Sequence, residues 1–106
     1  RLELNGINRF EYLDSEYFNY IQPYEYFENT PDDGINCYSF SLNPNHIQPS
    51  GTCNFSKLNK KSLKIKLNNS FYENLEENNN IVIDIYAINY NVLRFSKGLC
   101  GLGFNF

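Results

Sequence analysis

The chain has 106 residues and a formal net charge of −3 at pH 7, which argue against several classes of protein. A chain of this length forms at most one domain with a modest core. Its acidic balance gives no general attraction to nucleic acid, because nucleic-acid-binding domains usually carry a strongly basic face. No apolar run approaches the roughly 18 residues that a membrane-spanning helix needs. We therefore expect a single domain over residues 1–106 with no specific nucleic-acid partner.

Arg1 to Leu4 have the pattern of a short strand that begins at the first residue of the sequence. The sequence has no initiator methionine. We interpret the chain as an excised or truncated piece, so that the single domain is partial. Leu2 and Leu4 share one face of this strand. The dipeptide Asn5-Gly6 is a strong turn signal. A second extended piece, Ile7 to Tyr12, is expected to follow.

One short helix is predicted over Glu16 to Ile21. Asp14 or Ser15 can cap its N-terminus, and Pro23 is expected to prevent its extension. A helix of about two turns is not stable alone in water. Its aromatic side must therefore rest on a sheet or on a neighbouring subunit.

The stretch from Gly34 to Leu58 predicts two strands and the turn between them. Ile35 to Leu42 alternates bulky with small side chains, which is the period of two of a strand with two different faces. Asn43-Pro44-Asn45 and Pro49-Ser50-Gly51 then break the ladder. From Thr52 the chain is expected to extend again, so that local chemistry specifies the corner.

Five lysines form the only basic concentration in the sequence. From Leu63 on they alternate with apolar residues, which predicts a strand with an apolar inside and a lysine outside. Such lysines are typical of a solvated sheet face that resists aggregation, and the alternative is a contact with phosphate or lipid headgroups. The five are Lys57, Lys60, Lys61, Lys64 and Lys66.

The last third of the chain predicts a loop and further strands. Asn68 to Asn80 is polar and is expected to be an exposed loop. Ile81 to Tyr86 has the clearest strand pattern in the sequence, and Asn89 to Phe95 continues extended. The glycines between Gly98 and Phe104 lack the spacing of a nucleotide-binding loop, so close strand packing is the better explanation.

Few residues are candidates for chemistry. Asp32 and Asp33 could be metal ligands, but Asp-Gly pairs are common turn formers and no further carboxylates surround them as calcium loops require. His46 is the only histidine, which is too few for the common metal centres or for a Ser-His-Asp arrangement. Glu76 and Glu77 lie in the Asn-rich loop, where no fixed separation is expected. We predict no enzyme, no catalytic residue, no metal ligand and no cofactor.

Cysteines and possible glycosylation motifs support no strong prediction. Cys37, Cys53 and Cys100 cannot all pair within one chain. We expect free buried thiols, with a Cys37–Cys53 bridge as the alternative. Asn54-Phe55-Ser56 and Asn68-Asn69-Ser70 match the N-glycosylation pattern, but this match is frequent by chance, and neither is expected to be a site.

A series of short motifs runs along nearly the whole chain. The most specific is Gln48-Pro49-Ser50-Gly51, followed by Asn54-Phe55-Ser56. The others are Leu4-Asn5-Gly6, Tyr17-Phe18, Pro23-Tyr24, Gly34-Ile35-Asn36, Ser39-Phe40, Leu42-Asn43-Pro44, Asn89 to Arg94, Gly98, Gly101 and Leu102. In this order they resemble the C-terminal barrel of the major capsid proteins of nucleocytoplasmic large DNA viruses. Leu99 stands where that family often has methionine, which is a volume-conserving change.

The resemblance implies an all-β fold, namely a jelly-roll β-sandwich with one short helix, incomplete here as the C-terminal part of a double jelly-roll. It implies a structural protein that forms homotrimeric, pseudo-hexagonal capsomers of an icosahedral virus. Its location would be the capsid of the virion, assembled in the cytoplasm of the infected host. The implied partners are its own copies, minor capsid proteins and an internal viral membrane. Such a fragment should expose unpaired sheet edges and self-associate or remain partly unfolded.

Two other interpretations stay open. Tyr and Asn side chains could stack on and bind sugars, which would make the chain a carbohydrate-binding β-sandwich. Alternatively, the gene could be a remnant integrated in a host genome. The upstream reading frame separates the first of these from a capsid protein, because a second barrel supports the capsid, while a signal peptide or an enzyme domain supports the carbohydrate-binding module.

Overall fold

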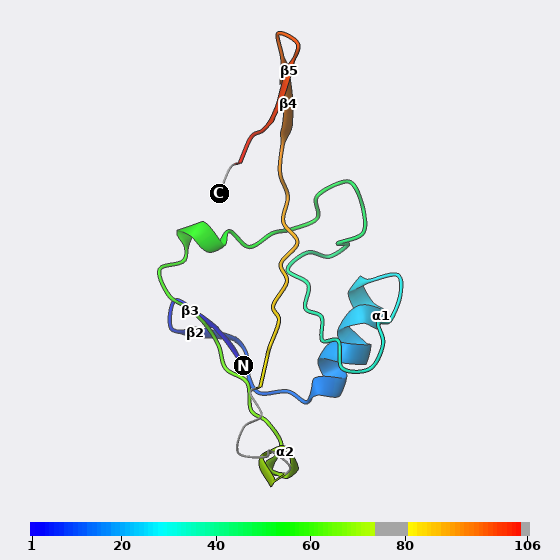
Figure 1. Cartoon of the computed structure of the whole chain (residues 1–106), viewed down its shortest axis with the longest axis vertical. Coiled ribbons are helices and arrows are strands. Elements are labelled where there is room, and N and C mark those ends of the chain that lie inside the picture. The colour runs from blue at the N-terminus through cyan, green and yellow to red at the C-terminus, as the bar shows by residue number, and fades with distance from the viewer. Residues whose placement is uncertain (74–80, 105–106) are drawn as a thin grey trace. The chain divides into compact units, whose positions relative to one another are not determined.

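The computed structural model describes residues 1–73 and 81–104 (Figure 1). The chain divides into two compact units, Arg1–Asn74 and Leu75–Phe106. Each unit contains one small antiparallel sheet, with strand order β2-β1-β3 in the first and β4-β5 in the second. These sheets are consistent with the predicted all-β class. The jelly-roll arrangement and the single partial domain stay predictions.

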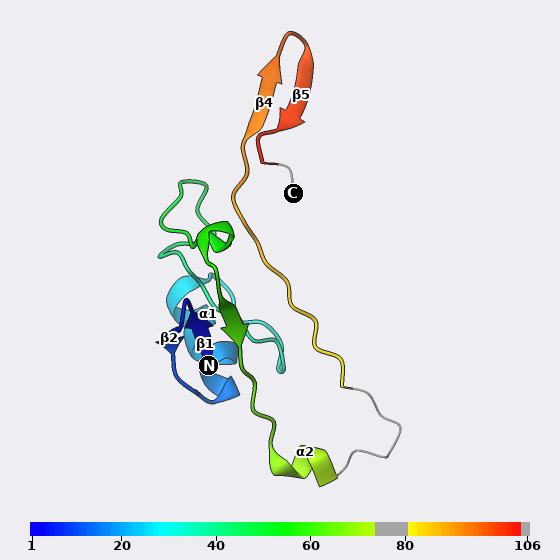
Figure 2. The ribbon, with the colours of Figure 1, turned by 90° about the vertical axis from the view of Figure 1, so that its left-hand side faces the viewer.

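The sheet of the first unit is built around β1 (Leu2–Leu4), which lies between β2 (Ile7–Phe10) and β3 (Lys61–Leu63) (Figure 2). Asn5 and Gly6 connect β1 to β2 with φ angles of 51° and 82°. Two successive residues with positive φ are the signature of a type I′ hairpin turn, which matches the right-handed twist of the strands. The predicted first strand and its turn are confirmed.

Leu2 supplies the buried centre of this sheet, with only 9% of its surface exposed. It pairs with Phe10 on one side and with Leu63 on the other. The pairing with β3 continues one residue further, because Lys64 N–H donates to Arg1 O and the Arg1 amino group donates to Lys64 O, each at 2.8 Å. The predicted lysine-bearing strand therefore exists, but it begins earlier and ends sooner than expected.

The predicted helix is present and runs further than expected. A π-helix, Tyr17–Ile21, passes directly into α1 (Gln22–Tyr26). The expectation that Pro23 would stop the helix is wrong. Gln22 N–H donates to the Tyr17 carbonyl five residues back, and this wider turn directly precedes Pro23. Pro23 then occupies the first turn of α1, where a missing N–H is tolerated.

Residues 35–42 do not form the predicted strand. The Cys37 N–H donates to the Phe18 carbonyl of the helix at 2.9 Å. The Ser39 N–H donates to the side-chain oxygen of Gln22 at 3.3 Å. A strand needs such amides for its ladder, and here the helix takes them. The segment therefore lies against the helix and belongs to neither sheet.

The corner after this segment is present without its second strand. Leu42 N–H donates to Ser50 O at 3.4 Å, and Asn43 N–H donates to Ser50 Oγ at 2.8 Å. Gly51 has a φ of +136°, and a Cβ there would lie 3.2 Å from the Phe40 carbonyl. These contacts hold the two sides of the corner together. A 3₁₀ turn, Phe55–Lys57, replaces the strand expected from Thr52.

Helix α2 (Asn69–Glu73) occupies the start of the predicted loop over residues 68–80, so that part of the prediction is wrong. Residues 74–80 lie outside the described residues. No helix in the described part of the chain is long and apolar enough to cross a membrane.

The second unit is a hairpin of β4 (Leu93–Ser96) and β5 (Leu99–Leu102). Lys97 and Gly98 form its turn, with φ angles of 50° and 76°. The strand predicted over residues 81–86 is not found, because no partner among the described residues pairs with it. Its apolar side chains are exposed instead.

Candidate functional site

Asn19 is buried at 5% exposure and fastens the turn that follows the helix. Its side-chain nitrogen donates to the carbonyls of Asp32 and Ile35 at 3.2 and 3.1 Å. Its side-chain oxygen accepts from the Gly34 N–H at 3.3 Å. All of its hydrogen-bonding capacity except one lone pair is therefore used on the backbone of residues 32–35.

Gln22, three residues later on the helix, is only 3% exposed and holds a later part of the loop. Its side-chain nitrogen donates to the Tyr17 hydroxyl at 3.0 Å, while its oxygen accepts from Ser39 N–H at 3.3 Å. Asn19 and Gln22 together form what we call the polar clamp. This clamp was not predicted from the sequence. The available signal was a pair of amide side chains three residues apart on a helix that is otherwise rich in aromatic residues.

Within the polar clamp, Asn19 holds the turn that contains Asp32 and Asp33, the two aspartates considered above as metal ligands. Asp32 and Asp33 are exposed, and Ile35 N–H donates to Asp32 O at 3.3 Å, which confirms the predicted turn. The Tyr20 hydroxyl donates to the Asp33 carboxylate, and this bond and the nearby charge raise the pKa of Tyr20. Among residues 1–73 and 81–104, no group of three His, Cys, Asp or Glu side chains could hold a metal ion.

His46 is exposed in the turn after Pro44, as predicted. Its N–H donates to Asn43 O at 3.3 Å. It borders a pocket of about 160 Å³, smaller than the roughly 300–1,000 Å³ of typical ligand sites. The lining residues are Glu25, Tyr26, Phe27, Glu28, Asn43, Asn45 and His46. The two predicted loop carboxylates, Glu76 and Glu77, lie outside the described residues.

A chain of aromatic rings connects the sheet, the helix and the loop of the first unit. Phe10 lies 5.1 Å from Phe18 and 4.9 Å from Tyr38 between ring centroids. Tyr38 continues to Phe40 at 5.0 Å, and Phe40 continues to Phe55 at 5.4 Å. Tilted and edge-to-face rings at these separations attract one another. The contact between Phe18 and Phe10 places the aromatic side of the helix against the first sheet, which is one of the two predicted arrangements.

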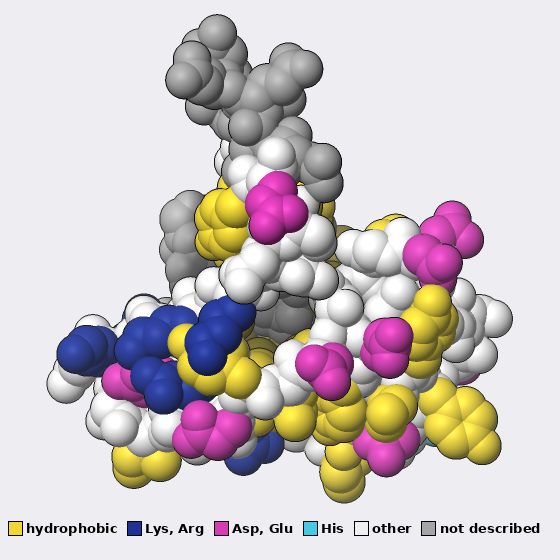
Figure 3. Space-filling model, turned by 90° about the horizontal axis from the view of Figure 1, so that it is seen from below, with side chains coloured by type: hydrophobic (Ala, Val, Ile, Leu, Met, Phe, Trp, Pro, Cys, Tyr) yellow, Lys and Arg dark blue, Asp and Glu magenta, His cyan; other side chains and the backbone are white. Residues whose placement is uncertain are grey.

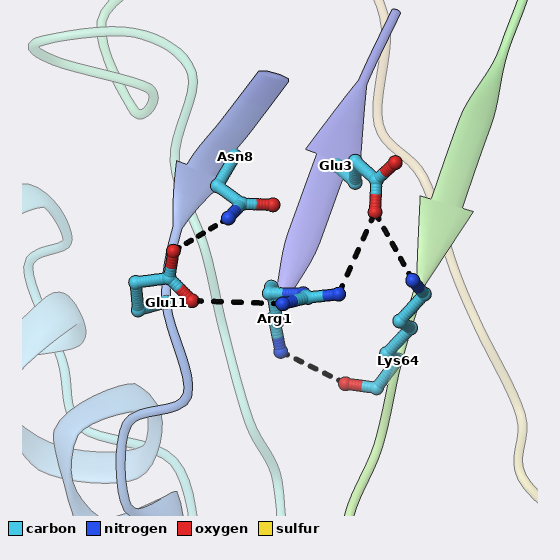
Figure 4. A network of polar contacts seen from close by, with 5 residues as sticks. All are labelled: Arg1, Glu3, Asn8, Glu11 and Lys64. Carbon is cyan, nitrogen blue, oxygen red and sulfur yellow. Dashed lines mark hydrogen bonds and ion pairs between the residues drawn. The ribbon is translucent and has the colours of Figure 1, made fainter. Parts of the chain in front are cut away.

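Charged side chains on and beside the first sheet form a network of ion pairs and hydrogen bonds, which Figure 4 shows. Lys64 Nζ lies 3.1 Å from a Glu3 carboxylate oxygen, and the Arg1 guanidinium lies 3.8 Å from the same oxygen. Arg1 also lies 3.9 Å from Glu11. The hydrogen bond and charge of Lys64 lower the pKa of Glu3. Lys66 lies 4.1 Å above the ring of Tyr12, at cation–π distance.

The apolar partners of the predicted lysine strand are not fully inside. Leu63 is 49% exposed and Ile65 is 50% exposed, while the lysines are exposed as expected. Lys61 Nζ donates to the Phe55 carbonyl at 2.8 Å. The predicted alternation is therefore correct for the lysines and only half correct for the apolar positions, since nothing in the described part of the chain covers that side.

The three cysteines are free, as expected, but they are less buried than predicted. Cys37 and Cys53 are half-buried, and Cys100 is exposed on β5. The asparagines of the two glycosylation motifs have local structural roles. Asn54 accepts from Ser56 N–H at 3.1 Å to begin the 3₁₀ turn, and Asn68 accepts from Ser70 N–H at 3.4 Å beside α2.

Close packing explains one of the three glycines near the C-terminus, since Gly103 allows a close approach while a Cβ on Gly98 or Gly101 would meet no described atom within 4 Å. A Cβ on Gly103 would lie 3.1 Å from the Val92 carbonyl, so a larger residue would displace the backbone. Asn91 binds the backbone of Phe104, the residue after Gly103. Its side chain donates to Phe104 O at 2.8 Å and accepts from Phe104 N–H at 3.0 Å. These contacts close the open end of the β4–β5 hairpin.

Residues 1–101 match the family model described as the large eukaryotic DNA virus major capsid protein. The chain belongs to this major capsid protein family. It is 43% identical over 105 residues to the major capsid proteins of Phaeocystis pouchetii virus and Chrysochromulina ericina virus. It is 36% identical over 121 residues to that of Paramecium bursaria Chlorella virus 1. The resemblance noted from the motifs is therefore confirmed.

These alignments to capsid proteins cover 99%, 99% and 98% of this chain, but only 20%, 18% and 27% of the respective relatives. The chain thus spans about a fifth of the length of the first two capsid proteins. The capsid motif Gln48-Pro49-Ser50-Gly51 lies at the corner where Gly51 approaches Phe40. In this member of the family, its most specific motif therefore has a structural role in the fold.

Proposed function

We propose that this chain is a structural part of a major capsid protein and helps to form the shell of an icosahedral large DNA virus. The observation that carries this proposal is the family match over residues 1–101. The described side chains fit such a role, because their polar contacts fasten turns, helix and sheet to one another. We propose no catalytic activity for it.

The finer proposal is an incomplete jelly-roll that assembles as a homotrimer into pseudo-hexagonal capsomers. The outer edges of β2 and β3 have no partner strand among the described residues. Exposed apolar side chains continue along residues 81–92, including Val82 at 77% and Ile88 at 101%. Unpaired edges and exposed apolar surface favour association with further strands. Minor capsid proteins and an internal viral membrane are the other proposed neighbours, in a virion assembled in the host cytoplasm.

Electron microscopy of the purified protein, as its gene encodes it, tests this proposal. We expect trimers with a nearly hexagonal outline, and we expect antibodies against the chain to label the shell of purified virions. A protein that stays monomeric at all concentrations and is missing from the virion would contradict the capsid role. A protein never produced during infection would favour the integrated remnant.

Carbohydrate binding is the competing proposal. A polar pocket lined by Asn, Glu and aromatic side chains together with His46 is the feature that favours it. A glycan array separates the two proposals, because a sugar-binding module retains defined glycans and a shell protein does not need to. Loss of such binding in His46→Ala, with folding unchanged, would locate the sugar in this pocket.

A further inference from the structure

Charges are strongly segregated along the first unit. Residues 10–56 contain seven carboxylates and neither Lys nor Arg. Residues 57–72 contain five lysines and neither Asp nor Glu. The chain as a whole is only mildly acidic, so its net charge conceals two regions of opposite sign.

The segregation also exists in space. We call the exposed carboxylates around the helix and the following turn the acidic face, and the five exposed lysines around β3 the lysine face. Within the first unit, Figure 1 places α1 on one side and β3 on the other. Figure 3 shows Lys and Arg side chains gathered on one side of the view. The acidic face consists of Asp14, Glu16, Glu25, Glu28, Asp32 and Asp33, and the lysine face consists of Lys57, Lys60, Lys61, Lys64 and Lys66.

Internal ion pairs leave most of these charges uncompensated. Those found in the described residues join Arg1 and Lys64 to Glu3 and Glu11. No carboxylate of the acidic face forms an ion pair within residues 1–73 and 81–104, and neither do Lys57 and Lys60. The two faces therefore present opposite charges to whatever lies outside the first unit.

We propose that the acidic face of one copy docks against the lysine face of a second copy. This inference rests on the proposed trimer, which brings copies of the chain together. The two faces are different patches of one chain, so the contact is head to tail, and such contacts generate rings when the rotation closes. A second copy is the matching partner because it carries both faces in similar amounts, six carboxylates against five ammonium groups.

Charge reversal in the protein as its gene encodes it tests this contact. One variant carries Lys57→Glu and Lys60→Glu, and another carries Glu25→Lys and Glu28→Lys. All four side chains are exposed and form no ion pair among the described residues, so folding should be retained and is checked by circular dichroism. We expect each variant to need about tenfold more protein to form trimers at low salt, because its substituted face keeps the original sign with much less charge. The lysine face falls from +5 to +1 in the first variant, and the acidic face falls from −6 to −2 in the second. High salt should reduce the difference.

Combining the reversals gives the decisive result. A chain with all four substitutions carries faces of −2 and +1, so it should form trimers less readily than either double variant. An equimolar mixture of the two double variants should not regain the trimer formation of the wild type. In a mixed ring of three, only one contact joins an unchanged acidic face to an unchanged lysine face, and the other two contacts are weakened. Asp84→Lys with Lys97→Glu, placed in the second unit, is the matched control and should leave trimers unchanged.

Three outcomes overturn the inference. If both double variants form trimers as readily as the wild type does, the docking contact is refuted and the proposed capsid role stays intact. A wild-type protein that never forms trimers would refute the proposed trimer and this contact together. The third outcome is binding to vesicles of anionic phospholipid, lost in the lysine variant while its trimers persist. That result would assign the lysine face to a membrane.

Discussion

The two units differ most in how they bury their side chains. In the first, Leu2 lies on the central strand between two partner strands, and Asn19 and Gln22 are buried against a loop that follows the helix. In the second, every residue of β4 and β5 is exposed, and Leu99 reaches 77%. Both contain a hairpin whose turn has positive φ angles. Turn chemistry is therefore sufficient for a hairpin, while burial depends on segments that return from elsewhere in the chain.

Replacing a leucine in each sheet should give the largest contrast between the units. Leu2→Ala should lower the free energy of unfolding by about 3 kcal/mol, because it removes buried methyl groups and leaves a cavity. Leu99→Ala, on an exposed strand, should cost less than about 0.5 kcal/mol. Urea denaturation followed by circular dichroism measures both. Equal losses would show that the second hairpin is as well covered as the first sheet.

Asn19→Ala should be the next largest effect. It leaves the Gly34 N–H without its acceptor and the Ile35 carbonyl without its donor, and it removes one of the two hydrogen bonds to the Asp32 carbonyl. Together these losses should cost about 2 kcal/mol. Hydrogen exchange at the Gly34 amide should become faster. Asn29→Ala, at an exposed asparagine before the same turn, is the control and should change neither quantity. An unchanged Gly34 amide in Asn19→Ala would contradict the polar clamp.

A glycine exchange in the second unit tests whether its turn alone holds the hairpin. Gly98 has a φ of +76°, and Gly98→Ala should cost about 1 kcal/mol because a Cβ disfavours this conformation. Gly101 lies in β5 without positive φ and with open space at its Cβ position, so Gly101→Ala is the control and should be tolerated. Cross-strand proton contacts in NMR spectra report hairpin formation. Equal effects of the two substitutions would exclude turn strain as the cause.

The sequence predicted correctly those features that neighbouring residues determine, such as turns, and failed where the partner lies elsewhere in the chain. Asn5-Gly6 predicted the first turn correctly because two positive φ angles favour those residues. The alternation in residues 35–42 predicted a strand wrongly. A period of two shows that the two sides of a segment have different surroundings, but it does not show which element lies against either side. Here that element is a helix, through Gln22. Pro23 was misjudged because the π-helical turn before it removes the usual conflict with a preceding carbonyl.

The family was predictable for a different reason. Motifs such as Gln48-Pro49-Ser50-Gly51 fix corners, because proline and glycine each permit particular backbone angles. The polar clamp was not predictable, since Asn19 and Gln22 gain their meaning only when residues 32–39 lie against the helix. The lysines of the lysine face lie close together in the sequence and were noticed there. The carboxylates of the acidic face are spread over a longer stretch and were not recognised as a group.

The smallest expected effect concerns Glu3, whose ion pairs tie β1 to the chain after β3. Its folded pKa lies below its ordinary value, so the unfolded chain binds a proton more readily. This contribution to stability is complete above the ordinary pKa and is lost as the pH falls through the folded pKa. Glu3→Gln should therefore lower stability slightly at neutral pH and flatten its decline in acid, as measured by urea midpoints across that range. Glu25→Gln, at an exposed carboxylate outside any ion pair of the described residues, should leave the acid decline as it is in the wild type. If Glu3→Gln behaves in the same way, the bond to Lys64 contributes nothing to the sheet.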